Sequence, residues 1–405
     1  MASTLCRVFV QAADRKFLAP VYFGYDYYRG IKYLTPPCLR LNDYIRDKTF
    51  LKLASAKDPS GDPDLERSEH GIDMVPAASR LPWPSGIRVC RQTKHWQTSL
   101  DATRRYVEAF GQSQFPDIVS RSGKSLEDIA QRELGPGFYD GWARFPLYLF
   151  PDGDEQCTRL VAILNVYAFI LDDFWEMHTL DKFSGVHQYI VSRLKGKAVS
   201  RDGKNAIERL TDDFVTEVNG IDHQRRNNYG AEMLRYLVTY LGRPPPQEKY
   251  NQMEDYLLYR YEDAAINTII ACTRFTLNIP ADMDSPRLAT YLQLVGHQIS
   301  ITNDIGSYQK EKEAYESGEV LYLINAVNVT RKLLNLTSEA AVAMTQALQY
   351  QVESQIDEEI CSLVEQDTLT AGEWRFVDAT ISLMTGNLLP SIVMSRYGGE
   401  MYKLR

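Results

Sequence analysis

Residues 160–176 read LVAILNVYAFILDDFWE and are the most informative part of the chain. The first twelve contain one strongly polar side chain, Asn165, which predicts a helix buried on all sides. Three acids, Asp172, Asp173 and Glu176, follow immediately. Buried carboxylates are costly unless cations or hydrogen-bond donors meet them, so positive charge is expected beside them. Asp172 and Glu176 share a helix face at about 100° per residue, which directs a carboxylate cluster into one cavity.

The composition describes a chain that can form a large core and does not attract polyanions as a whole. The chain has 405 residues, 44% of them hydrophobic, and a formal net charge of -8. This acidic balance disfavours nucleic acid as a partner, and an anionic substrate would need a local cluster of Lys and Arg. The six cysteines show no metal-ligand or redox spacing, and the chain shows no signal-peptide pattern, which favours a cytoplasmic protein. Every apolar run is too short to span a bilayer, so no membrane insertion is expected.

The order of patterns along the chain predicts an all-α fold. Pro and Gly interrupt every apolar run in residues 1–95, which we expect to form an irregular segment packed on a helical domain, residues 96–405. The periodicity and end signals predict helices at 99–111, 125–133, 138–149, 155–177, 183–195, 203–219, 229–241, 320–333, 338–366 and 371–388.

Two longer helices are also predicted in the second half. One should begin at the three prolines 244–246 and end before Asn278. The other should start at Pro286, with Ser285 as its N-cap, and end before Gly318. At 1.5 Å per residue this second helix would be about 48 Å long and would cross the whole domain.

A second polar motif lies on that last helix. Asn303, Ser307 and Glu311 are spaced i, i+4 and i+8, so they form one stripe on a helix face. An amide oxygen, a hydroxyl and a carboxylate suit a hard divalent cation such as magnesium rather than zinc or copper. The alternative is a polar face turned to solvent. The acids at 172–176 have a similar alternative as a charged helix end, although acids there oppose the helix dipole.

Together these motifs resemble those of the class I terpene synthases, of the microbial sesquiterpene synthase type, in which an Asp-rich motif faces an Asn/Ser/Glu motif across a helical bundle. Residues 172–176, DDFWE, are similar to the first motif, with Glu in place of the usual final Asp. Asn303, Ser307 and Glu311 match the second motif at full spacing. The resemblance therefore implies a helical bundle around a central active-site cavity.

The resemblance also assigns residues that bind the diphosphate of a substrate. Arg260 resembles the arginine that senses diphosphate in the family, and Asp263 and Ala264 fall where its linker and effector residues lie. Together with Asp172 these are the expected catalytic residues. Three further residues resemble the remaining diphosphate donors: Lys310, Arg396 and Tyr397.

The implied activity is that of a carbon–oxygen lyase acting on phosphates. In the family, the two motifs hold three magnesium ions that bind the diphosphate of a linear prenyl substrate, so the metal ligands expected here are Asp172, Asp173, Glu176, Asn303, Ser307 and Glu311. Farnesyl diphosphate is the expected substrate, and ionisation, cyclisation and release of diphosphate would give a sesquiterpene. The resulting carbocation requires a cavity that excludes water and offers aromatic faces. Phe169, three residues before Asp172, and Phe145 are predicted to line it.

Other functions are compatible with parts of this pattern. A diterpene cyclase would act on geranylgeranyl diphosphate, and cavity depth would decide between the two substrates. A chain-elongating prenyltransferase shares the fold but has a second Asp-rich motif in place of the Asn/Ser/Glu triad. A non-catalytic helical binding module would give no reason to keep every ionic position. The chain has Leu388-Leu389-Pro390 where many family members have an aromatic residue. The protein is expected to be a monomer or a homodimer.

Overall fold

The computed structural model describes residues 70–74, 83–87, 90–113, 125–135, 137–176, 190–196, 205–247, 249–366, 368–394 and 397. In these residues the predicted all-α class is confirmed, because helices form nearly all of the regular structure. The first half contains α5 (Trp96–Gly111), α6 (Leu126–Glu133), α7 (Phe145–Leu149), α8 (Glu155–Glu176), α10 (Ser192–Leu194), α11 (Ala206–Arg225) and α12 (Tyr229–Leu241). The second half contains α13 (Met253–Asp263), α14 (Ile266–Leu277), α15 (Ala289–Glu316), α16 (Ala326–Leu334), α17 (Ser338–Gln366) and α18 (Ala371–Val393).

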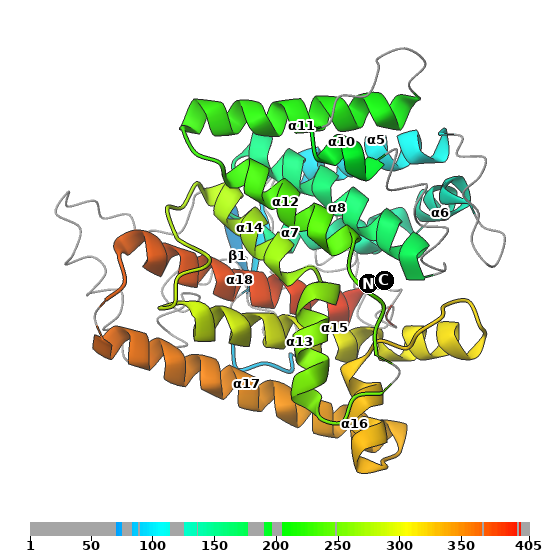
Figure 1. The fold of residues 1–405 in the computed structure, drawn as a ribbon, viewed down its shortest axis with the longest axis vertical. Helices are drawn as coiled ribbons and strands as arrows, with labels where there is room; N and C mark the ends of the chain where they lie inside the picture. The colour runs from blue at the N-terminus through cyan, green and yellow to red at the C-terminus, as the bar shows by residue number, and fades with distance from the viewer. Residues whose placement is uncertain are drawn as a thin grey trace, which may run out of the picture.

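The helices form one bundle with α8 near its centre. Figure 1 shows α11 along one side and α17 along the opposite side, with α8, α12, α14, α15 and α18 between them. Helix α8 packs against α5, α6, α12 and α14, and α15 packs against α13, α16, α17 and α18. The two helices that carry the predicted motifs, α8 and α15, therefore belong to the same bundle.

Helix α8 is buried as its composition predicts. Between Leu160 and Leu171, all side chains except Ala168 and Phe169 are buried, and Asn165 is the one strongly polar residue among them. Full burial of one large apolar side chain stabilises a fold by about 1.5 to 3 kcal/mol, so this helix is a major contributor to the core. Ala168 and Phe169 are partly exposed because they face the cavity described below.

The predictions for the two longer helices of the second half are wrong in their extent. The helix expected before Asn278 is broken into α13 and α14, because Ala265 has a φ of 55°. An L-residue in this left-handed conformation cannot continue a right-handed helix, so the chain turns directly after Asp263. Helix α15 starts three residues later than expected, since residues 285–288 close a tight turn in which Leu288 N donates to Ser285 O at 3.0 Å.

Smaller differences also have local causes. The helix expected at 138–149 is interrupted at Gly141, whose extended backbone separates 3-10 turns at Phe138–Asp140 and Trp142–Arg144, the second of which leads into α7. Helix α16 begins at Ala326 rather than near 320, because the Asn325 side chain caps it by accepting a hydrogen bond from Val327 N at 2.9 Å. Of the helix expected at 183–195, the described residues contain α10, and residues 183–189 lie outside them.

The segment predicted to be irregular contains a small sheet. Strands β1 (Gly71–Met74) and β2 (Cys90–Thr93) pair antiparallel, with Gly71 opposite Thr93 and Met74 opposite Cys90. All four residues of β2 are buried, and the strand packs on α7 and α18. A strand buried on both faces lacks the polar and apolar alternation that the sequence pattern requires, which explains the missed assignment.

Other described residues before 96 also contact the bundle. Ser85 Oγ and Gly86 N each donate to the Glu353 carboxylate of α17 at 2.8 Å. Arg91 lies 2.6 Å from Asp152 in a buried ion pair. The division of the chain at residue 95 stays a prediction.

Among the described residues, α18 is the one helix that is long and apolar enough to cross a membrane by length and composition. In this structure 89% of the most apolar 18-residue stretch of α18 is buried inside the protein. Such burial is typical of a core helix, since an apolar helix must be covered by other elements of the fold.

Candidate functional site

A cavity lies among α7, α8, α12, α13, α14, α15 and α18 and has two chemically different regions. Its apolar lining residues are Phe145, Leu149, Phe150, Val161, Leu164, Ala168, Phe169, Ala264, Ala265, Ile269 and Ile299. Its charged and polar lining residues include Asp172, Asp173, Tyr240, Arg260, Asp263, Asn303, Lys310, Glu311 and Tyr397. On both α8 and α15 the apolar lining residues precede the charged ones, so each helix contributes to both regions.

An arginine meets each of the first two acids of the motif at 172–176. Arg243 Nη2 donates to Asp172 Oδ1, and the Arg243 side chain is only 3% exposed. Arg132 Nη2 lies 2.5 Å from Asp173 Oδ2. Burial raises the pKa of Asp172 above its ordinary value, and the adjacent Arg243 guanidinium opposes that rise. The expected positive charge at this helix end is therefore present.

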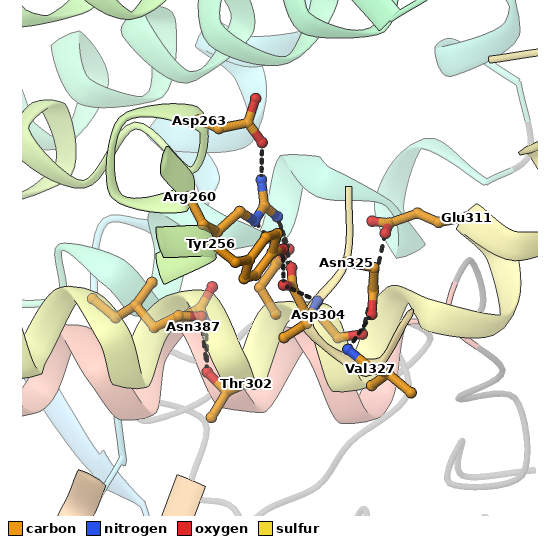
Figure 2. A network of polar contacts seen from close by, with 12 residues as sticks. Tyr256, Arg260, Asp263, Thr302, Asp304, Glu311, Asn325, Val327 and Asn387 are labelled. Atoms are coloured by element: carbon orange, nitrogen blue, oxygen red, sulfur yellow. Dashed lines mark hydrogen bonds and ion pairs between the residues drawn. The ribbon is translucent and has the colours of Figure 1, made fainter. Parts of the chain in front are cut away.

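The second motif forms the predicted stripe on α15, but its three members have different surroundings. Asn303 Oδ1 accepts a hydrogen bond from Arg260 Nη2 at 3.2 Å. Glu311 Oε2 accepts one from Asn325 Nδ2 at 2.9 Å, as Figure 2 shows. Ser307 is fully buried, and its hydroxyl has no hydrogen-bond partner among the described residues. An unpaired buried hydroxyl is unfavourable, so among the described residues the Ser307 oxygen is the member of the stripe that can bind a ligand without giving up another partner.

Arg260 is the centre of a buried network beside the second motif (Figure 2). Its Nη2 lies 2.9 Å from Asp304 Oδ1, and its Nη1 pairs with Asp263 Oδ2. Burial raises the pKa of Asp304 to about 6, although Arg260 opposes the rise. Burial would also raise the pKa of Asp263, but Arg243 and Arg260 together hold it below its ordinary value. A guanidinium held in this way is a preorganised anion-binding group.

Two comparisons with known sequences agree with this geometry. The family model of the terpene synthase family 2 C-terminal metal-binding domain matches residues 164–355, a span that includes both motifs. Terpene cyclase 6 of Gibberella fujikuroi is 24% identical over 347 residues, 80% of this chain and 85% of that protein. Phomopsene synthase of Phomopsis amygdali is 22% identical over 66% of this chain but only 36% of its own length.

The chain therefore resembles the terpene synthases over the part that carries both motifs. Solved structures share its fold: aristolochene synthase from Penicillium roqueforti has a TM-score of 0.57 at 17% identity and covers 74% of this chain and 94% of its own. Wild-type cucumene synthase has a TM-score of 0.54 at 16% identity and covers 77% of this chain and 98% of its own. At these identities the likeness concerns the fold, which is that of the class I terpene synthases.

The structure brings most of the predicted site residues to one cavity. The predicted residues that line it are Phe145, Phe169, Asp172, Asp173, Arg260, Asp263, Ala264, Asn303, Lys310, Glu311 and Tyr397. Ser307 lies on the same helix but is fully buried and does not line the cavity. Glu176 belongs to α8, but its side chain lies outside the described part of the chain, as does the whole of Arg396. Their roles stay predictions.

The residues of the second motif fit a divalent cation by their chemistry. They offer an amide oxygen, a hydroxyl and a carboxylate, and the Ser307 hydroxyl is a buried oxygen without a hydrogen-bond partner in the part of the chain that the structure describes. In the described part of the chain, no three His, Cys, Asp or Glu side chains lie close enough together to hold a metal by themselves. Cation binding by this protein would therefore need oxygens beyond its own carboxylates, and the phosphate oxygens of a substrate can supply them.

Sequence reasoning missed three residues that hold the predicted ones in place. Arg243 pairs with Asp172, Asp304 pairs with Arg260, and Asn325 donates to Glu311. The requirement for positive charge beside buried acids pointed to an arginine such as Arg243, but nothing in the local sequence selects which one. Asp304 follows Asn303 directly but lies outside the i, i+4 and i+8 stripe, so that pattern did not select it.

Proposed function

We propose that this protein is a terpene synthase, a magnesium-dependent cyclase that ionises a linear prenyl diphosphate, cyclises the resulting carbocation and releases diphosphate. Farnesyl diphosphate is the proposed substrate and a sesquiterpene the proposed product. The observation that carries the proposal is a single cavity in which carboxylate, amide and guanidinium groups adjoin an apolar and aromatic region. This arrangement matches a substrate with a charged head and a hydrocarbon tail.

Each group of residues has a distinct task in the proposed reaction. Asp172, Asn303, Ser307 and Glu311 would hold magnesium, which when bound withdraws negative charge from the leaving diphosphate. Arg260, aligned by its carboxylate partners, would donate charge-assisted hydrogen bonds to the same anion. Lys310 and Tyr397 line the cavity and would add further donors.

The aromatic wall would protect and stabilise the carbocation. Phe169 stacks on Trp142, with ring centroids 5.2 Å apart, and on Phe145, with centroids 5.5 Å apart. Phe145 and Phe169 both line the cavity, and this stack fixes the orientation of their rings. Fixed aromatic faces stabilise nearby cations, and an apolar wall excludes the water that would trap them.

Product analysis tests the proposal. The purified full chain is incubated with geranyl, farnesyl or geranylgeranyl diphosphate plus Mg²⁺, and volatiles and diphosphate release are measured. Cyclic C15 hydrocarbons or alcohols from farnesyl diphosphate, lost after exhaustive chelation, are the expected result. Cyclic products formed only from geranylgeranyl diphosphate would show that this diphosphate, and not farnesyl diphosphate, is the substrate. Elongated diphosphates would indicate a prenyltransferase. Undiminished turnover after chelation contradicts the metal dependence.

Ser307→Ala should weaken magnesium binding without weakening the fold. The variant removes a buried hydroxyl that has no hydrogen-bond partner among the described residues, so unfolding stability should stay equal or rise by up to about 1 kcal/mol. Loss of a ligand oxygen should raise the Mg²⁺ concentration for half-maximal turnover by about tenfold. Mg²⁺ titrations of initial rate and thermal unfolding measure the two effects.

The matched control for this substitution is Ser300→Ala. Ser300 lies on the same helix, is 1% exposed and also has no hydrogen-bond partner for its hydroxyl among the described residues, but it is not part of the stripe formed by Asn303, Ser307 and Glu311. Its loss should leave the Mg²⁺ titration unchanged. Equal Mg²⁺ dependence in both variants would remove Ser307 from the proposed ligands.

Phe169→Leu should redistribute the products without stopping ionisation. The substitution removes one aromatic face from the cavity wall but keeps apolar volume, so the carbocation folds and terminates differently. We expect the main product to lose its dominance while diphosphate release falls by less than about tenfold, since a cation–π contact contributes roughly 1 kcal/mol. Phe214→Leu is the control, because Phe214 is buried against Tyr167 and does not line the cavity. An unchanged product profile for Phe169→Leu would exclude this role.

A further inference from the structure

A continuous series of ion pairs joins the helix of the second motif to the helix of the first. It starts on α15, where Asp304 binds Arg260 at 2.9 Å. Arg260 also pairs with Asp263 at the end of α13. Asp263 Oδ1 in turn accepts a hydrogen bond from Arg243 Nε at 2.7 Å, and Arg243 Nη2 donates to Asp172 on α8. Negative and positive groups therefore alternate from one motif to the other.

Arg243 occupies a fixed position in this series. Its guanidinium carbon lies 3.9 Å from the centroid of the Trp175 ring and 4.4 Å from that of Tyr240. Its side chain is 3% exposed, so solvent does not replace either carboxylate partner. The planar guanidinium uses Nε for Asp263 and Nη2 for Asp172, which a lysine ammonium cannot reproduce in the same geometry.

The balance of charge makes these contacts interdependent. Two guanidinium groups serve three carboxylates, of which those of Asp263 and Asp304 are buried and that of Asp172 is 26% exposed. An anion that binds Arg260 competes with Asp263 for the same N–H donors, so Asp263 then depends more on its other partner, Arg243. Stronger pairing of Arg243 with Asp263 weakens its pairing with Asp172, whose carboxylate then becomes available to a cation.

We propose that Arg243 is a positioning residue that couples diphosphate binding at Arg260 to cation binding at Asp172. The inference rests on the proposed function and extends it, because it assigns to a residue outside both motifs the communication between them. Coupling of two binding events is reciprocal, so diphosphate must strengthen cation binding by the same factor by which the cation strengthens diphosphate binding.

The test uses inorganic diphosphate and Mg²⁺ as probes and needs no turnover. Trp175 reports on Arg243, because the guanidinium lies against its ring. Mg²⁺ is titrated with and without diphosphate, the free Mg²⁺ concentration is calculated, and the Trp175 signal is identified by comparison with Trp175→Phe. In the wild-type protein, diphosphate should lower the free-Mg²⁺ midpoint by about tenfold.

Two variants should remove this coupling, and a third should retain it. Arg243→Lys keeps the positive charge but loses the planar guanidinium that binds two carboxylates. Asp263→Asn removes the carboxylate that joins Arg243 to Arg260. In each, the ratio of the two midpoints should fall from about ten to about one or two. Arg235→Lys is the matched control: Arg235, on α12, also lies against a tyrosine ring, that of Tyr236, but it is exposed and outside the series. Its ratio should equal that of the wild type.

Each outcome supports or overturns the inference. Circular dichroism and thermal unfolding first establish whether the variants are folded. If neither Arg243→Lys nor Asp263→Asn is folded, the Trp175 signal of the wild-type protein tests the inference. Unchanged midpoint ratios in both Arg243→Lys and Asp263→Asn overturn the coupling. It is also overturned if calorimetry detects Mg²⁺ and diphosphate binding to the wild type while the Trp175 emission stays constant. If calorimetry detects no binding at all and prenyl diphosphates are not converted, the proposed function itself fails.

Discussion

Glu311→Ala and Asn303→Ala should each lower kcat at least about a hundredfold, since a lost metal ligand removes roughly 3 kcal/mol of transition-state stabilisation. Both residues line the cavity on α15, and neither contributes large apolar volume to the core. Asn325 keeps its hydrogen bond to Asp304 O at 2.8 Å when Glu311 is truncated, so α16 should stay in place. Rates of diphosphate release with Mg²⁺, together with thermal unfolding, measure both parts of the prediction.

The control for this prediction is Glu313→Ala, two residues further along the same helix. Glu313 is exposed and accepts a hydrogen bond from Gln309 at 2.6 Å, so its loss removes a carboxylate of the same helix without touching the cavity. It should retain the wild-type kcat. Wild-type rates in Glu311→Ala would show that this carboxylate binds no metal in the transition state, and the second motif would then be a polar helix face.

The parts of the site predicted correctly from the sequence depend on spacing within one helix. Asn303 and Glu311 both face the cavity because residues separated by four and eight positions share a helix face, wherever the helix starts. The start of α15 was misplaced by three residues, yet the stripe was unaffected. The burial of α8 was equally predictable, because twelve residues with one polar member leave no face for solvent.

The parts that were missed depend on contacts between distant segments. Arg243 and Asp172 are 71 residues apart, and no local pattern states that they meet. The break after α13 falls at Ala264 and Ala265, whose residue type is the best helix former. The local preference loses there because tertiary contacts hold the end of α13, where both Arg243 and Arg260 bind Asp263. Tertiary contacts of this kind also place Ala264 and Ala265 on the cavity.

Gly386→Ala should destabilise the protein by about 3 kcal/mol or more, because it introduces an atom where two backbones touch. A Cβ at this position in α18 would lie 2.0 Å from Tyr148 O and 2.5 Å from Tyr148 C. Both are backbone atoms of α7, so no side-chain rotation relieves the overlap and the helices must separate. The contact also positions Phe145 on α7 and Asn387 on α18, which line the cavity from these two helices. Thermal unfolding and the product profile should therefore change together.

The comparison that isolates this contact is Gly220→Ala. Gly220 lies inside α11, and a Cβ there would meet no atom within 4 Å. Alanine in an unobstructed helical position is favoured over glycine by about 0.5 to 1 kcal/mol, so this variant should be more stable than the wild type. The same substitution thus has opposite signs at the two sites, and the difference measures how closely α18 approaches α7. Equal stability of the two variants would mean that the helices adjust around the extra methyl, and the cavity wall they form would then be pliable rather than fixed.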